Sequence, residues 1–118
     1  MTAPVYWVYV LECENDSLYT GYTTNLLRRF EEHKRGIRCR YTRSFKPRAI
    51  AGAWYTEDRG QALSMERFLK SLGKAQKLAF ITAPERLVEH FAHRGPVLIW
   101  EERDRQEVEN GTQGMAGE

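Results

Sequence analysis

The sequence feature that most restricts the fold is residues 5–33, where two strand-like runs lead directly into a helix-like run. Val5–Leu11 and Leu18–Tyr22 are rich in aromatic and β-branched residues, and the residues between them include Asn, Asp and Ser, which favour turns. This pattern predicts a β-hairpin. We expect a helix over Thr24–Arg35 to follow, because apolar residues then recur at helical spacing and Gly36 is placed to end it.

One stripe of this helix is predicted to face the core, and it carries Leu26, Leu27 and Phe30. Arg29 and His33 are four residues apart, so they share a flank beside that stripe. The residues expected on the solvent side are Arg28 and Glu32. The polar side chains that the hairpin and the helix could bring together beside the sheet are Tyr9, Tyr19, Arg29 and His33.

The rest of the chain predicts a single small domain over residues 1–100. Ala49–Tyr55 is predicted to be a third strand, and Gln61–Leu72 has the apolar spacing of an amphipathic helix. Shorter helices are expected over Lys74–Ile81 and Pro84–Ala92. The predicted fold class is therefore α+β, an α/β sandwich with a small three-stranded antiparallel sheet flanked by helices.

Residues 28–48 hold nine Lys or Arg against two acids, a density typical of proteins that bind a phosphate backbone. Within them, Ile37–Arg48 shows no clear period, and Pro47 argues against a continuing helix, so we interpret it as an exposed loop. Its basic residues alternate with aromatic ones, a pattern that suits DNA. For Tyr41 and Phe45, packing onto the sheet is an equal alternative. The predicted DNA-binding residues are Arg28, Lys34, Arg38, Arg40, Tyr41, Arg43, Lys46 and Arg48.

The C-terminal residues have a different character. Residues 101–118 carry a net charge of −4 and few apolar side chains, so we expect an acidic, disordered tail. Just before it, the apolar run Val97–Trp100 either packs on the domain or meets a protein partner.

The sequence also suggests where the protein acts. No apolar run approaches the roughly 20 residues that a membrane span needs, and the first residues lack the pattern of a signal peptide. We therefore expect a cytoplasmic protein without a membrane partner, with two free thiols, and a monomer rather than an oligomer.

Two short motifs carry a family resemblance. Trp7-Val8-Tyr9 and Tyr19-Thr20-Gly21 resemble the paired motif of the GIY-YIG endonuclease superfamily. The resemblance covers residues 4–81 and is greatest to the small stand-alone bacterial members. This sequence departs from the motifs at two positions, with Trp7 in place of the first glycine and Thr20 in place of the isoleucine.

The resemblance extends to the two longer helices. Arg29-Phe30 resembles the family's helix arginine, and His33 matches a histidine or tyrosine that often follows one turn later. Ser64-Met65-Glu66 resembles the segment with the metal-binding glutamate. The residues that the resemblance implies as catalytic are Tyr9, Tyr19, Arg29, His33 and Glu66.

The resemblance implies a metal-dependent DNA endonuclease that hydrolyses phosphodiester bonds, with DNA structure as the basis of selectivity and a link to DNA repair or recombination. Glu66 would hold Mg²⁺ or Mn²⁺, Arg29 would hold the phosphate, and Tyr9 would be the general base. From the residues alone, Tyr9 could instead be a core tyrosine, and Glu66 could form a surface ion pair with Lys70. Two other functions stay open, an inactive nucleic-acid-binding module and a protein-interaction adaptor, and RNA is not excluded as the ligand.

Overall fold

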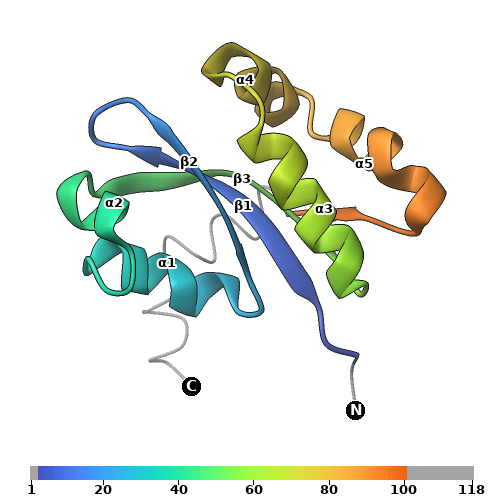
Figure 1. Ribbon diagram of the computed structural model, residues 1–118, viewed down its shortest axis with the longest axis horizontal. Coiled ribbons are helices and arrows are strands. Elements are labelled where there is room, and N and C mark those ends of the chain that lie inside the picture. Colours follow the sequence, from blue (N-terminus) through green and yellow to red (C-terminus); the bar gives the residue numbers. More distant parts are fainter. Residues whose placement is uncertain (1–2, 101–118) are drawn as a thin grey trace.

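The computed structural model describes residues 3–100, which form one antiparallel sheet with helices on both faces (Figure 1). The fold is therefore α+β, as predicted. The elements, in chain order, are β1 (Tyr6–Cys13), β2 (Leu18–Thr23), α1 (Leu26–Lys34), α2 (Arg40–Ser44), β3 (Pro47–Thr56), α3 (Arg59–Lys70), α4 (Lys74–Thr82), α5 (Glu85–Phe91), a 3₁₀ turn (Ala92–Arg94) and β4 (Leu98–Ile99).

The sheet has the strand order β2-β1-β3-β4, and every neighbouring pair is antiparallel. β1 is central, and within it Tyr9 lies opposite Gly21 of β2 and Ala53 of β3. Because successive side chains of a strand point to opposite faces, Val8 and Val10 face one side of the sheet and Tyr9 faces the other. This alternation decides which helix each side chain meets.

Two hydrophobic clusters lie on the two faces of the sheet. One joins Val8, Val10 and Trp54 to Met65 and Leu69 of α3, and it extends to α5. The other joins residues of the opposite sheet face to α1, namely Tyr9, Leu11, Cys13, Leu26, Phe30, Ile50, Ala53 and Trp100. Full burial of a side chain such as Leu69 contributes about 1.5–3 kcal/mol, so both helices are held firmly. Tyr9 therefore faces α1, whereas Glu66 belongs to the helix on the other face (Figure 1).

Two features of the predicted fold are wrong. Residues 37–48 are not one exposed loop, because they contain α2 and the start of β3. The five residues of α2 are too few to show a helical period. The sheet has four strands rather than three, because Leu98–Ile99 pairs with Trp54 and Tyr55 of β3. A two-residue strand depends on its neighbour and leaves no pattern of its own.

The apolar run Val97–Trp100 packs on the domain, which is one of its two expected outcomes. Val97 and Trp100 are buried on opposite faces of the sheet, and the Trp100 backbone N–H donates to the Ala53 carbonyl at 2.9 Å. Leu98 is 53% exposed. No helix among residues 3–100 is long and apolar enough to cross a membrane. The expectation of a disordered tail concerns 101–118, outside the described residues.

Candidate active site

Tyr9 owes its position to the glycine beside it. The Tyr9 side chain is buried and lies across the backbone of Gly21 on β2. A Cβ added at Gly21 would stand 2.5 Å from Cζ and 2.9 Å from Cε2 of Tyr9, closer than real Cβ contacts come. The glycine therefore leaves the space in which the phenol ring lies.

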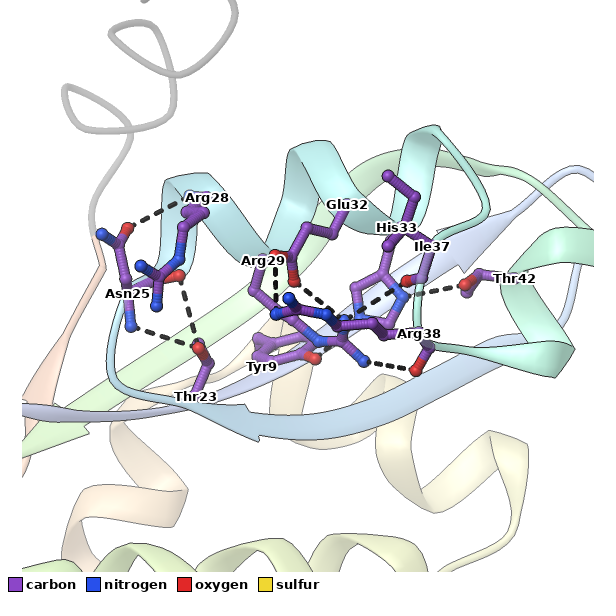
Figure 2. A network of polar contacts seen from close by, with 10 residues as sticks. All are labelled: Tyr9, Thr23, Asn25, Arg28, Arg29, Glu32, His33, Ile37, Arg38 and Thr42. Atoms are coloured by element: carbon purple, nitrogen blue, oxygen red, sulfur yellow. Dashed lines mark hydrogen bonds and ion pairs between the residues drawn. The ribbon is translucent and has the colours of Figure 1, made fainter.

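His33 lies directly over the Tyr9 hydroxyl. Its Nε2 and the Tyr9 oxygen are hydrogen-bonded at 2.7 Å, and its Nδ1 is hydrogen-bonded to Oγ1 of Thr42 at 2.9 Å (Figure 2). The imidazole is fully buried. Burial, together with the positive charge of Arg29, lowers the pKa of His33 to about 4, so the ring is neutral at pH 7.

The burial of His33 corrects the predicted face of α1. Leu26, Phe30 and His33 face the core, whereas Leu27, which was predicted to be buried, is 39% exposed. An imidazole with both nitrogens hydrogen-bonded can take the place of an apolar residue in a core.

The Tyr9 phenol is protonated at pH 7. Burial raises its pKa to about 12, and electrostatic interactions with Cys39 and Glu66 act in the same direction. The hydrogen bond and positive charge of Arg29 act the other way. Glu66 therefore acts electrostatically on Tyr9 although its helix lies on the other face of the sheet. To act as a general base, Tyr9 must pass its own proton to an acceptor.

Arg29 is fixed between α1 and the segment that follows it. Its Nη1 donates to Glu32 Oε1 at 3.0 Å, and its Nη2 donates to the Arg38 carbonyl at 3.2 Å (Figure 2). Glu32 was expected on the solvent side, but its side chain is only 18% exposed, because it pairs with both Arg29 and Arg38. The hydrogen bond from Arg29 holds the pKa of the Glu32 carboxyl below its usual value.

Tyr19 lies in the same layer, between His33 and α2. Its ring meets the His33 ring edge-on, with centroids 5.2 Å apart, and stacks on the Tyr41 ring at 5.7 Å. Burial and a hydrogen bond to Cys39 raise the pKa of Tyr19. Tyr41 also hydrogen-bonds through its hydroxyl to Ser17 of the hairpin turn. The structure thus brings together four of the five predicted catalytic side chains, those of Tyr9, Tyr19, Arg29 and His33.

Glu66, the fifth, lies on α3, the helix on the other face of the sheet. Its carboxylate is 17% exposed and forms an ion pair with Lys70 Nζ at 3.1 Å, the alternative that the sequence left open. Within residues 3–100 it forms no hydrogen bond or ion pair with the other four side chains, although its charge acts to raise the pKa of Tyr9.

Comparison with known protein families identifies the family of this chain. The profile of the GIY-YIG catalytic domain matches residues 5–79. The chain belongs to the GIY-YIG family. The GIY-YIG domain is a nuclease domain.

Relatives of this GIY-YIG protein include UPF0213 proteins. One from Cupriavidus necator is 44% identical over 81 residues, which span 68% of this chain and 88% of the relative. One from Listeria monocytogenes is 39% identical over 83 residues, which span 70% and 92% of the two chains. The solution NMR structure of a UPF0213 protein from Bacillus halodurans is 32% identical, with a TM-score of 0.44, and covers 67% of this chain and 84% of that one.

The two departures from the GIY-YIG motifs have different structural effects. Trp7 packs against Tyr55 of β3, with ring centroids 4.5 Å apart, so the large side chain is accommodated as a cross-strand aromatic pair. Thr20 is buried, and its hydroxyl has no hydrogen-bond partner among the described residues. An isoleucine at this position would bury no polar atom.

The side chains of this GIY-YIG domain suit a hard divalent cation only with help from water and substrate. No group of three or more His, Cys, Asp or Glu side chains within residues 3–100 could hold a metal ion. Mg²⁺ is commonly bound through one or two carboxylates, with waters and substrate phosphates completing its shell. The Glu66 carboxylate would meet that requirement if it exchanged its partner Lys70 for a cation.

The predicted DNA-binding residues lie in and around α1 and α2. They differ in their exposure and in whether an acidic side chain pairs with them. Lys34 pairs with Glu31 at 2.8 Å, and Arg48 pairs with Glu12 and Asp16 of the hairpin. Of the other predicted residues, Arg28, Arg40 and Arg43 are exposed and form no ion pair within residues 3–100, while Arg38 is shared with Glu32 and Lys46 is half-buried.

Sequence reasoning missed two residues of the site. Glu32 contacts Arg29, and its spacing of three residues on one helix could have indicated the pair. Thr42 contacts His33 from a separate element, and nothing in its local sequence marks it.

Proposed function

We propose that the protein is a metal-dependent DNA endonuclease that hydrolyses phosphodiester bonds. One observation carries the proposal: the Tyr9 hydroxyl is hydrogen-bonded to a neutral, buried His33 and lies beside the fixed cation of Arg29. A phenol, a proton acceptor and a guanidinium at one place support attack by water on a phosphate. The family membership supports the same reaction class.

The proton path follows from the hydrogen bond between the Tyr9 hydroxyl and Nε2 of His33. Tyr9 would take a proton from the attacking water as it passes its own proton to Nε2 of His33, so that no free phenolate has to exist beforehand. Arg29 would bind the scissile phosphate and counter its developing charge, for which its planar fork is well suited. Tyr19 would help to orient the phosphate.

Glu66 would be the protein ligand of Mg²⁺ or Mn²⁺. When bound, such a cation supplies positive charge for the leaving oxygen. Lys70 would release the carboxylate when the cation and DNA enter.

The substrate would lie across α1 and α2. Arg28, Arg40 and Arg43 would contact phosphates, and Tyr41, which is 37% exposed, offers a partly open ring for stacking. Contacts to the backbone carry no sequence information, so selectivity would come from DNA structure. That selectivity is the basis on which we propose a role in DNA repair or recombination.

The test is single-turnover cleavage of duplex, nicked, branched and single-stranded DNA, and of RNA, with Mg²⁺ or Mn²⁺. Glu66→Gln should abolish cleavage while DNA binding is kept, because it removes a metal ligand and almost no volume. Tyr9→Phe should lower the rate roughly 100-fold or more, because it removes only the hydroxyl. Rates near that of the wild type in both variants would refute the proposal.

A nucleic-acid-binding module without cleavage is the second candidate. It is favoured by the two ion pairs that neutralise the site, Arg29 with Glu32 and Glu66 with Lys70. If they persist in the DNA complex, neither a phosphate nor a cation gains access. DNA binding that depends on salt, without cleavage of any of these substrates under either metal, would establish this function instead.

A further inference from the structure

Thr42 is the one fully buried residue of α2, and it faces the site rather than solvent. Its Oγ1 is 2.9 Å from Nδ1 of His33, on the side of the imidazole away from Tyr9 (Figure 2). The other four residues of α2 are exposed. The short helix therefore presents a single hydroxyl to the ring that contacts Tyr9.

The hydrogen bonds of His33 to Tyr9 and Thr42 can be arranged in only two ways, because a neutral imidazole carries one N–H proton. A neutral imidazole has one N–H donor and one acceptor nitrogen, so His33 donates to one of its two hydroxyl partners and accepts from the other. If Nδ1 carries the proton, Thr42 accepts it and Nε2 is free to accept the proton of Tyr9. If Nε2 carries the proton, it donates to Tyr9, and the histidine cannot act as the acceptor.

The Tyr9 hydroxyl decides between these two arrangements. Tyr9 is buried, and the polar groups that contact its hydroxyl among residues 3–100 are Nε2 of His33 and the guanidinium of Arg29. A guanidinium only donates, so Nε2 is the acceptor for the phenolic proton. The imidazole proton then lies on Nδ1, and Oγ1 of Thr42 accepts it.

We propose that Thr42 is a positioning residue that holds His33 in the Nδ1–H tautomer and so directs the Nε2 lone pair at the Tyr9 hydroxyl. The order of donation is Tyr9 to His33 and His33 to Thr42. The consequence for catalysis rests on the proposed nuclease function, whereas the tautomer itself does not. Thr42 touches neither water nor phosphate in this scheme and acts only through His33.

The tautomer can be observed without any cleavage. Nitrogen-15 NMR of the imidazole at pH 7 distinguishes the protonated from the unprotonated nitrogen of His33. We expect the Nδ1–H form in the wild type and in Thr42→Ser, which keeps the hydroxyl. Thr42→Val keeps the shape but removes the acceptor, so the Nε2–H form should become populated. Thr42→Ala also removes the acceptor and should populate the Nε2–H form as well.

Cleavage supplies the second readout. Thr42→Val should lower the single-turnover rate roughly 10-fold or more without weakening DNA binding, because the wrong tautomer cannot take the Tyr9 proton. Thr42→Ser should restore the rate to near that of the wild type. Ser44→Ala, at the exposed end of the same helix, is the matched control and should change neither the tautomer nor the rate.

Each outcome decides the inference. An Nε2–H form in the wild type would overturn it, as would a Thr42→Val protein that keeps the Nδ1–H form, or a Thr42→Ser protein that loses it. If the wild type cuts no nucleic acid, the proposed function fails, and the tautomers of the wild type, Thr42→Ser and Thr42→Val still decide the role of Thr42. If Thr42→Val does not fold, Thr42→Ala provides the decision together with the wild type and Thr42→Ser.

Discussion

His33 predicts a specific loss of stability in mild acid. The folded protein keeps this imidazole neutral until its pKa of about 4, whereas in the unfolded chain the pKa is about 6.5. Between these values the unfolded chain binds a proton that the folded protein does not. The contribution of His33 to stability is therefore complete above pH 6.5 and is lost as the pH falls towards 4.

The size of this effect follows from the shift. One pKa unit corresponds to 1.36 kcal/mol, so the full difference is about 3 kcal/mol, and about 2 kcal/mol of it is lost between pH 7 and pH 5. Solvent screening does not reduce this free energy, because the ring is fully buried. The charged groups that act on it are Arg29, which strengthens the shift, and Glu32, which opposes it. A domain of this size has few kcal/mol to lose.

Urea unfolding at pH 7, 6 and 5 measures the effect in the wild type and in His33→Gln. The wild type should lose about 2 kcal/mol more than the variant between pH 7 and 5. His90→Gln and His93→Gln alter exposed histidines and should behave as the wild type. Parallel pH dependence in the wild type and His33→Gln, or a His33 resonance that titrates near pH 6.5, would refute the reasoning.

Three further predictions concern other parts of the chain. Gly21→Ala should displace the phenol ring that lies over it and lower cleavage roughly 100-fold, whereas Gly73→Ala, where an added Cβ meets nothing within 4 Å, should cleave as the wild type does. Thr20→Val should raise the free energy of unfolding by about 1 kcal/mol in a urea titration, because it removes a buried hydroxyl without a partner; an unchanged value would mean that the hydroxyl is paired. Changing Arg40 and Arg43 together to Gln should weaken DNA binding and reduce the slope of log affinity against log salt by about 2, and an unchanged slope would place the DNA elsewhere.

The sequence predicted the parts of the fold whose pattern is local. The three long strands and the helices α1, α3, α4 and α5 each repeat apolar residues at a regular spacing, and the structure places them within two residues of the predicted ends. The helix α2 and the strand β4 have no such repeat. Each depends on contacts with residues distant in sequence, as Thr42 contacts His33, and such contacts cannot be read from a short segment.

The site was predictable as a set of residues but not as an arrangement. Tyr9, Arg29 and His33 were expected to meet because the hairpin and the helix that carry them are adjacent in sequence. The burial of His33 was missed because an imidazole is not counted as apolar. The position of α3, the helix of Glu66, on the opposite face was also missed, because the sequence does not show on which side of a sheet a helix packs.

The match to the catalytic family ends at residue 79, but the packing of the domain continues beyond it. Leu87, Phe91 and Val97 fill the cluster on one face of the sheet, and Trp100 fills part of the cluster on the other. The Trp54 indole N–H donates to the Pro84 carbonyl at 3.0 Å. A fragment trimmed to the catalytic match would keep every proposed catalytic side chain and yet expose the indole of Trp54 and the free edge of β3, two features that favour aggregation. The unit that can be expressed, grafted or fused therefore extends at least to residue 100.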